Sequence, residues 1–337
     1  MLIVIDMEQH ASRSRSIARG TSSSQHSMSS RRVHRRIGWV SATLVTALLL
    51  ASCGSDAVSS DAAEPIGDCP ATPMQVVVSV DQWGDIVEEL GGDCAVVTTI
   101  VKGSAADPHD YEPSPADSAE FERADLVVVN GLDYDHWSED AIATLDPPPA
   151  VVNAGEVVGL SEGDNPHIWY GPDYVAEVAD AVTTELQELS PDASEYFAER
   201  LTEWQTSMQP YDEEIEKIRA VSAGKNYGAT ESVFEYMATA VGLEDVTPQG
   251  YRNAAANESE PGPADVAEFR TALEQSEVSV LVYNTQTEGP GPEQIRSTAE
   301  SADVPVVDVT ETVPPGTDSF VEWQVTQLRA LAAALGA

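Results

Sequence analysis

The chain has 337 residues, of which 17 are basic and 57 are acidic, so its formal net charge is −40. Proteins that bind nucleic acid or anionic lipid use clustered Lys and Arg, and this charge balance argues against both functions. Hydrophobic residues make up 42% of the chain, which is enough for a packed core in one large domain or two medium ones.

The basic residues are concentrated at the N-terminus. Residues 1–52 carry seven arginines and two acids, and four of the arginines directly precede an apolar run at 37–50. That run is shorter than the roughly 20 residues of a membrane span and is typical of a signal peptide. It ends in LASCG at residues 50–54, which resembles a bacterial lipobox, so Cys53 is the expected site of lipidation. The alternative is an anchor helix with a chance cysteine.

Met28 begins a leader of ordinary length and is the expected translation start, which would make residues 1–27 an extension of the gene model. Residues 53–70 are small and polar without apolar periodicity, so we predict a flexible tether there. Together these segments predict an extracytoplasmic protein anchored to the cell membrane by lipid.

Two further cysteines, Cys69 and Cys94, lie beyond the leader. Outside the cytoplasm two thiols usually pair, so we expect a Cys69–Cys94 disulfide. Two buried free thiols are the alternative.

Apolar β-branched runs alternate with helical patterns after residue 70. The alternation predicts an α/β fold with two similar lobes, each with a parallel sheet, at 71–190 and 222–337. One long linker helix at 191–221 joins them, and Pro210 is expected to kink it. The expected strands are 74–80, 94–100, 124–130, 150–153, 227–230, 243–247, 278–283 and 304–309. The expected helices, apart from the linker, are 82–90, 115–123, 136–144, 172–189, 232–241, 262–276, 291–302 and 320–335.

Polar side chains next to these elements define a candidate site, because ligands of α/β sheets bind at the carboxyl ends of the strands. His109, Glu231 and Glu311 follow predicted strands, and His167 precedes the 172–189 helix. Imidazole and carboxylate suit Zn²⁺ and Mn²⁺. We therefore predict that these four residues hold one divalent ion in the cleft between the lobes.

Other assignments stay open at these positions. Asp308 is a rival to Glu311 as fourth ligand, and Glu231 could instead be a first-turn acid favoured by the helix dipole. Asn284 and Gln286 are expected to line the cleft as hydrogen-bonding neighbours of the ligands. His136 is expected to be exposed to solvent.

Four motifs carry a resemblance to a known family. DPHDYEP at 107–113 and NPHIW at 165–169 resemble the two histidine motifs of the solute-binding lipoproteins of bacterial zinc/manganese ABC importers, cluster A-I type. TESVFEY at 230–236 resembles their third motif, where the ligand is His or Glu. TET at 310–312 matches the position of a C-terminal acidic ligand that is usually Asp. The resemblance covers residues 70–337.

The resemblance implies a non-enzymatic, monomeric protein that captures one metal ion and delivers it to an ABC permease and its ATPase. Zinc is favoured, and manganese remains possible because the chain lacks the His- and acid-rich loop common in zinc-specific members.

The sequence leaves two other functions open. A secreted metal-dependent hydrolase would use the same ligands with an open position and would need a general base, for which the sequence offers no clear candidate. The chain also contains no HExxH, G-x-S-x-G or P-loop motif. An adhesin-like metal-binding lipoprotein is the remaining alternative.

Overall fold

The computed structural model describes residues 67–337, apart from residues 106, 258, 288 and 318. The predicted signal peptide, Cys53 and most of the tether lie outside the described residues. The described residues all belong to one compact unit. No helix among them is long and apolar enough to cross a bilayer.

The first half of the fold contains a four-stranded parallel sheet with the order β2-β1-β3-β4. Its central strands are buried on both faces, which explains their continuous β-branched runs. The strands are β1 (Met74–Val80), β2 (Ala95–Val101), β3 (Leu126–Val129) and β4 (Ala150–Asn153). The helices are α1 (Asp81–Gly91), α2 (Pro115–Phe121), α3 (His136–Ala143), α4 (Ala154–Val157) and α5 (Pro172–Leu189).

The second half contains another four-stranded parallel sheet, with the order β6-β5-β7-β8. Its strands are β5 (Asn226–Ala229), β6 (Glu244–Asp245), β7 (Leu281–Asn284) and β8 (Val306–Val309). The helices are α8 (Glu235–Val241), α9 (Gln249–Ala256), α10 (Pro263–Glu274), α11 (Pro290–Ser301) and α12 (Phe320–Leu335). Both halves therefore alternate strands with helices around a parallel sheet, which confirms the predicted α/β fold class.

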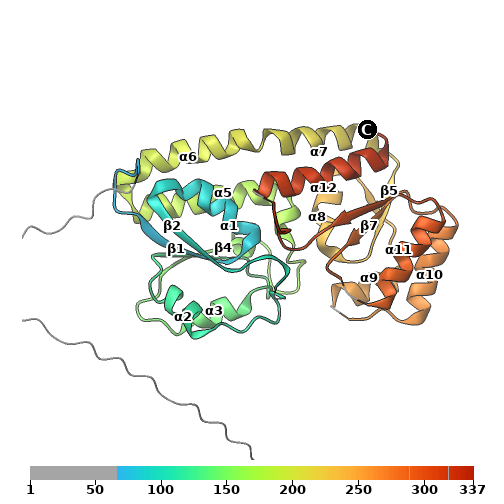
Figure 1. The fold of residues 1–337 in the computed structure, drawn as a ribbon, viewed down its shortest axis with the longest axis horizontal. Coiled ribbons are helices and arrows are strands. Elements are labelled where there is room, and N and C mark those ends of the chain that lie inside the picture. The colour runs from blue at the N-terminus through green and yellow to red at the C-terminus, as the bar shows by residue number, and fades with distance from the viewer. Residues whose placement is uncertain (1–66, 106, 258, 288, 318) are drawn as a thin grey trace, which may run out of the picture. The chain divides into compact units, whose positions relative to one another are not determined.

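A long helical segment links the two halves. It consists of α6 (Ser194–Ser207) and α7 (Gln209–Ser222), which follow one another end to end in Figure 1. The interruption falls at Met208, because Pro210 has no N–H to donate to the preceding turn. The chain still stays helical, since the amide of Asp212 donates to the carbonyl of Met208 at 3.1 Å. α6 packs on α1 and α5, whereas α7 packs on α8 and α12.

The two sheets share one hydrophobic core. The largest buried cluster includes Val77 and Val128 from the first sheet and Val282 and Val307 from the second. A smaller cluster lies beneath α9, α10 and α11, and Leu281 of β7 points into it. Strand β7 therefore buries one face in each cluster, as expected for a strand covered on both sides.

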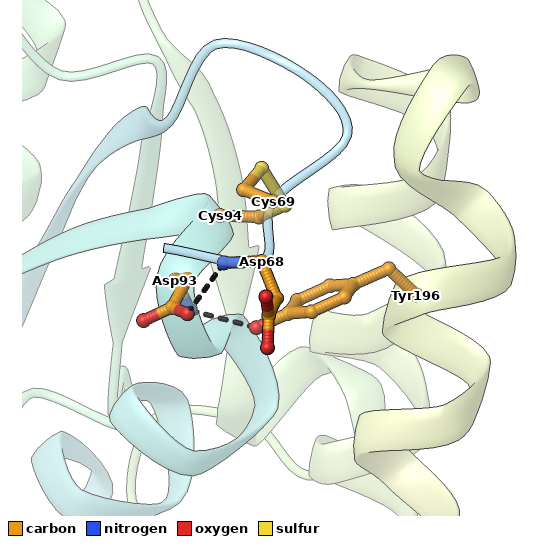
Figure 2. Close-up of a disulfide and its surroundings, with 5 residues drawn as sticks. All are labelled: Asp68, Cys69, Asp93, Cys94 and Tyr196. Atoms are coloured by element: carbon orange, nitrogen blue, oxygen red, sulfur yellow. Dashed lines mark hydrogen bonds between the residues drawn. A yellow bond between two sulfur atoms is a disulfide. The ribbon is translucent and has the colours of Figure 1, made fainter. Parts of the chain in front are cut away.

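The predicted Cys69–Cys94 disulfide is present, with a Cα–Cα distance of 5.0 Å. Figure 2 shows it beside Asp68 and Asp93, whose hydrogen bonds hold the same segment. The amide of Asp93 donates to the hydroxyl of Tyr196 in α6 at 2.8 Å. The disulfide thus attaches the start of the described chain to the end of α1 and, through Tyr196, to the linker.

Two helices are absent from the sequence prediction. α4 is a single short turn capped by Asn153, whose side chain accepts from the amide of Glu156. α9 begins directly after Pro248 and contains Gly250, which weakens its helical pattern. The omission of α9 matters because this helix helps to form the cavity described below.

Candidate metal centre

Three of the four predicted ligands lie in loops that line a cavity between the two sheets. The cavity has a volume of about 1060 Å³ and is lined by His109, Glu231 and Glu311. His109 lies beyond the short turn Gly103–Ala105, and Glu231 and Glu311 follow β5 and β8. His167 does not line the cavity, but it lies directly against Glu311.

Glu311 brings the two imidazoles together. Its Oε1 lies 3.7 Å from Nε2 of His167 and 3.8 Å from Nε2 of His109. The same oxygen accepts a hydrogen bond of 2.9 Å from the hydroxyl of Tyr134. Burial opposes ionisation of this carboxyl, but His167, His109 and Tyr134 outweigh burial and hold the pKa of Glu311 below its usual value.

His167 is held in one orientation with one nitrogen unpartnered. Its Nδ1 lies 2.6 Å from Oδ1 of Asn165. The amide nitrogen of Asn165 donates to the carbonyl of Ser232, which fixes Oδ1 as the acceptor for the imidazole proton. The Nε2 of His167 is buried and has no hydrogen-bond partner among the described residues. A lone pair at this buried atom fits a metal ligand, because a carbonyl on the other ring nitrogen is the usual support for a ligating histidine.

His109 is positioned by an aromatic contact and by its own loop. Its ring meets the ring of Tyr134 edge-on, with 4.6 Å between centroids. The carboxylate of Asp107 accepts from the amide of His109 at 3.0 Å, and the indole of Trp137 donates to the carbonyl of Pro108 at 2.9 Å. These bonds hold the backbone of the DPH segment in place.

Glu231 lines the same cavity as Glu311 and is held by two hydrogen bonds. Its Oε2 accepts from the side-chain amide of Asn284 at 2.5 Å and from the hydroxyl of Thr287. Burial and the neighbouring charge of Glu311 raise the pKa of Glu231. A cation between the two carboxylates would remove that repulsion.

The two predicted neighbours each lie beside one glutamate. Asn284 contacts Glu231 as described above. Oε1 of Gln286 accepts from the amides of Glu311 at 2.6 Å and Thr312 at 2.9 Å, so it shapes the turn that presents Glu311.

The ligands do not form a finished cage. Within the part of the chain that the structure describes, no three His, Cys, Asp or Glu side chains are already grouped as a metal would require.

The other sequence candidates lie elsewhere. Asp308 faces solvent and pairs with Arg296 at 2.6 Å, so it is outside the cavity. His136 is exposed, as expected, and lies 3.9 Å from Asp133.

Several residues that sequence reasoning missed support the site. Tyr134 is fully buried, and its hydroxyl also accepts from Nε2 of Gln82 at 2.8 Å. Asn165 belongs to the NPHIW motif, and its side chain orients His167. Tyr251 of α9 lines the cavity and is also fully buried. One sequence signal was available for two of them. Tyr134 and Asn165 lie in short segments rich in Asp, Asn and Gly, a composition that is typical of turns.

The site is bridged on both sides by hydrogen bonds between the two halves. On one side the hydroxyl of Tyr236 donates to the carbonyl of Asn165 at 2.8 Å. On the other side Gln82 donates to the carbonyl of Glu311 at 3.1 Å, and the hydroxyl of Tyr170 donates to the carbonyl of Thr310 at 2.7 Å. Side chains of each half thus form hydrogen bonds with the segments of the other half that carry the predicted metal ligands.

The chain is similar in sequence to known metal-uptake proteins. The family model described as zinc-uptake complex component A, periplasmic, matches residues 76–334. The chain is 24% identical over 255 residues to the high-affinity zinc uptake system protein ZnuA of Bacillus subtilis strain 168, covering 70% of this chain and 77% of that protein. It is 24% identical over 289 residues to the manganese ABC transporter substrate-binding lipoprotein PsaA of Streptococcus mitis, covering 81% and 88%.

Solved structures show the same fold. A Mn-bound mutant of a periplasmic metal binding protein from Candidatus Liberibacter asiaticus superposes with a TM-score of 0.67 at 16% identity, covering 78% of this chain and 99% of that one. A mutant of the laminin-binding adhesin Lmb from Streptococcus agalactiae gives a TM-score of 0.65 at 24% identity, with the same coverage. With the family model matching most of the sequence, the chain belongs to the family of zinc-uptake component A proteins, the non-enzymatic metal-binding proteins of zinc and manganese ABC importers.

Proposed function

We propose that this protein captures one divalent transition-metal ion between His109, His167, Glu231 and Glu311 and hands it to an ABC permease. The observation that carries the proposal is the position of Glu311, whose carboxylate lies within 4 Å of both imidazoles, beside an unpartnered Nε2 of His167. Two carboxylates balance the charge of a divalent ion, and two neutral imidazoles complete four-fold coordination.

Charge explains why the site favours a cation. Glu231 and Glu311 are buried near each other, and their repulsion opposes ionisation of Glu231. Binding a dication turns this repulsion into attraction for both carboxylates. Because histidine and carboxylate ligands must be deprotonated, capture releases protons and weakens as the pH falls.

The choice of ion follows from ligand chemistry and availability. Imidazole and carboxylate donors suit both zinc and manganese, and the usual order of affinities makes zinc bind more tightly in vitro. We favour zinc on this basis, with manganese as the second candidate.

The cellular setting extends the proposal. Relatives of this chain are described as lipoproteins or periplasmic proteins. We propose that Cys53 carries lipid and anchors a monomer on the outer side of the cell membrane, where it meets its permease and the associated ATPase.

Metal analysis of the purified protein tests the site. We expect one zinc or manganese ion per chain, and His109→Ala or His167→Ala should weaken binding by at least about 100-fold, because ligand loss should exceed the 10–100-fold effect of losing a supporting residue. His136→Ala is the matched control, since this histidine is exposed and lies outside the cavity. Full stoichiometry and unchanged affinity in both ligand variants would refute the assignment.

A further inference from the structure

The two oxygens of the Glu231 carboxylate have different surroundings. Its Oε2 accepts two hydrogen bonds, one of 2.5 Å from the side-chain amide of Asn284 and one from the hydroxyl of Thr287. A carboxylate oxygen has two lone pairs, so these two donors occupy Oε2 completely. Its Oε1 accepts no hydrogen bond from the residues that the structure describes. Glu231 therefore offers a metal ion Oε1 alone.

The turn that follows β7 holds both donors in place. Asn284 is buried, and its Oδ1 accepts from the amide of Gln286 at 3.1 Å, so its Nδ2 is the end that faces Glu231. Its backbone amide donates to the hydroxyl of Thr230 at 3.1 Å. The amide of Thr287 donates to the carbonyl of Asn284 at 3.3 Å and closes the turn. A metal could reach Oε2 only by breaking a bond to a charged acceptor, and such bonds are among the stronger ones in proteins.

The carboxylate of Glu311 is less restricted. Its Oε1 accepts one hydrogen bond, from Tyr134, so a second lone pair remains on the oxygen that lies near both imidazoles. The described residues donate no hydrogen bond to its Oε2. With one nitrogen from each of two imidazoles, one oxygen from Glu231 and one or two from Glu311, the protein offers four or five donor atoms.

We propose that Asn284 and Thr287 set the metal preference of the site by limiting Glu231 to one coordinating oxygen. Zinc is satisfied by four ligands, whereas manganese prefers an octahedral, oxygen-rich shell. Covering Oε2 withholds an oxygen from manganese and takes nothing from zinc. The inference rests on the proposed metal site, and it adds a reason specific to this chain to the general order of metal affinities.

Competition between zinc and manganese tests the role of the Thr287 hydroxyl. Thr287→Ala should release one lone pair of Oε2 and leave space beside it. The ratio of zinc affinity to manganese affinity should then fall by about tenfold, a change of 1.4 kcal/mol. A general loosening of Glu231 would weaken both ions alike and cancels in this ratio. The electron paramagnetic resonance signal of free Mn²⁺ measures manganese binding and its displacement by added zinc.

Thr287→Ser is the matched control, because it keeps the hydroxyl and should keep the preference. Co²⁺ bound to the unmodified protein gives a second measurement that needs no variant. We expect the intense visible absorption of a four- or five-coordinate ion rather than the weak absorption of a six-coordinate one. An unchanged ratio in Thr287→Ala, an equal fall in Thr287→Ser, or a six-coordinate cobalt spectrum would overturn the proposal while leaving the metal site intact. Failure of the unmodified protein to bind either zinc or manganese would instead contradict the site itself.

Discussion

Tyr134 is the residue that connects the metal ligands to the rest of the fold. Its ring contacts His109, with 4.6 Å between centroids, and Trp169, with 5.0 Å, while its hydroxyl donates to Glu311 and accepts from Gln82. Burial and the charge of Glu311 raise the pKa of Tyr134, so it remains a neutral donor. This donor holds the carboxylate in the orientation that faces both imidazoles.

Removing that hydroxyl should weaken the metal site without disturbing the fold. For Tyr134→Phe we expect metal affinity to fall by about tenfold, the lower end of the effect of losing a residue that supports a ligand. A chelator-competition titration measures this. Tyr211→Phe is the control, because this buried hydroxyl has no hydrogen-bond partner in the described structure and lies outside the cavity. Equal affinities in the two variants would show that Tyr134 does not position Glu311.

The contact between α7 and α12 contains a buried ionic group. Glu214 of α7 is almost covered and accepts from Lys217 at 2.9 Å and from Arg329 of α12 at 3.2 Å. The hydrogen bond from Lys217 lowers the pKa of Glu214, burial opposes this, and Arg329 lowers it further. Because the folded pKa lies below the unfolded one, the stabilisation is present above the unfolded pKa and is lost as the pH falls through the folded pKa.

We therefore expect Glu214→Gln to lower the free energy of unfolding by about 1 kcal/mol at neutral pH, since both cationic partners are largely exposed. The deficit should vanish at acid pH, once Glu214 is protonated in both states. Denaturant unfolding across this pH range measures the effect. Glu216→Gln provides the comparison, because its pair with Arg219 is exposed within one helix. A deficit independent of pH would contradict an ionic origin.

The disulfide acts on stability rather than on the metal. It closes a 25-residue separation, and removing such a crosslink costs about 3 kcal/mol through the entropy of the unfolded chain. The double variant Cys69→Ala/Cys94→Ala should lose about that much in denaturant unfolding. Its metal affinity should stay unchanged, because neither cysteine lines the cavity. A large loss of affinity would show that the disulfide shapes the site.

The elements could be predicted where local chemistry determines them. β1 and β3 follow from β-branched runs that only a covered parallel sheet accommodates, and Pro210 marks the interruption of the linker. α9 could not be predicted, because Gly250 and a short length leave little periodicity. The candidate ligands were recognisable from motifs. The role of Tyr134, in contrast, depends on its contact with Glu311, which lies 177 residues away in the sequence. No local pattern encodes such a contact.

At the scale of the whole molecule, the halves are joined more firmly than two lobes around a hinge. One hydrophobic core runs through both sheets, and the linker packs on both. Asn165 donates to Ser232 and accepts from Tyr236, so the segment that carries His167 is bonded to the residues that follow Glu231. Opening a wide cleft would break these bonds together with those of Gln82 and Tyr170.

Metal capture and release should therefore proceed with little change in the arrangement of the halves. Each bridging hydrogen bond contributes about 1 kcal/mol, and wide opening would also expose buried core, so movement of the ligand loops is less costly than rotation of a half. Small-angle scattering should give the same radius of gyration with and without metal. Hydrogen exchange should slow on metal binding in the loops that carry His109, Glu231 and Glu311. A clear compaction on metal binding, of the kind produced by hinge closure, would show that these bridges break in the metal-free protein.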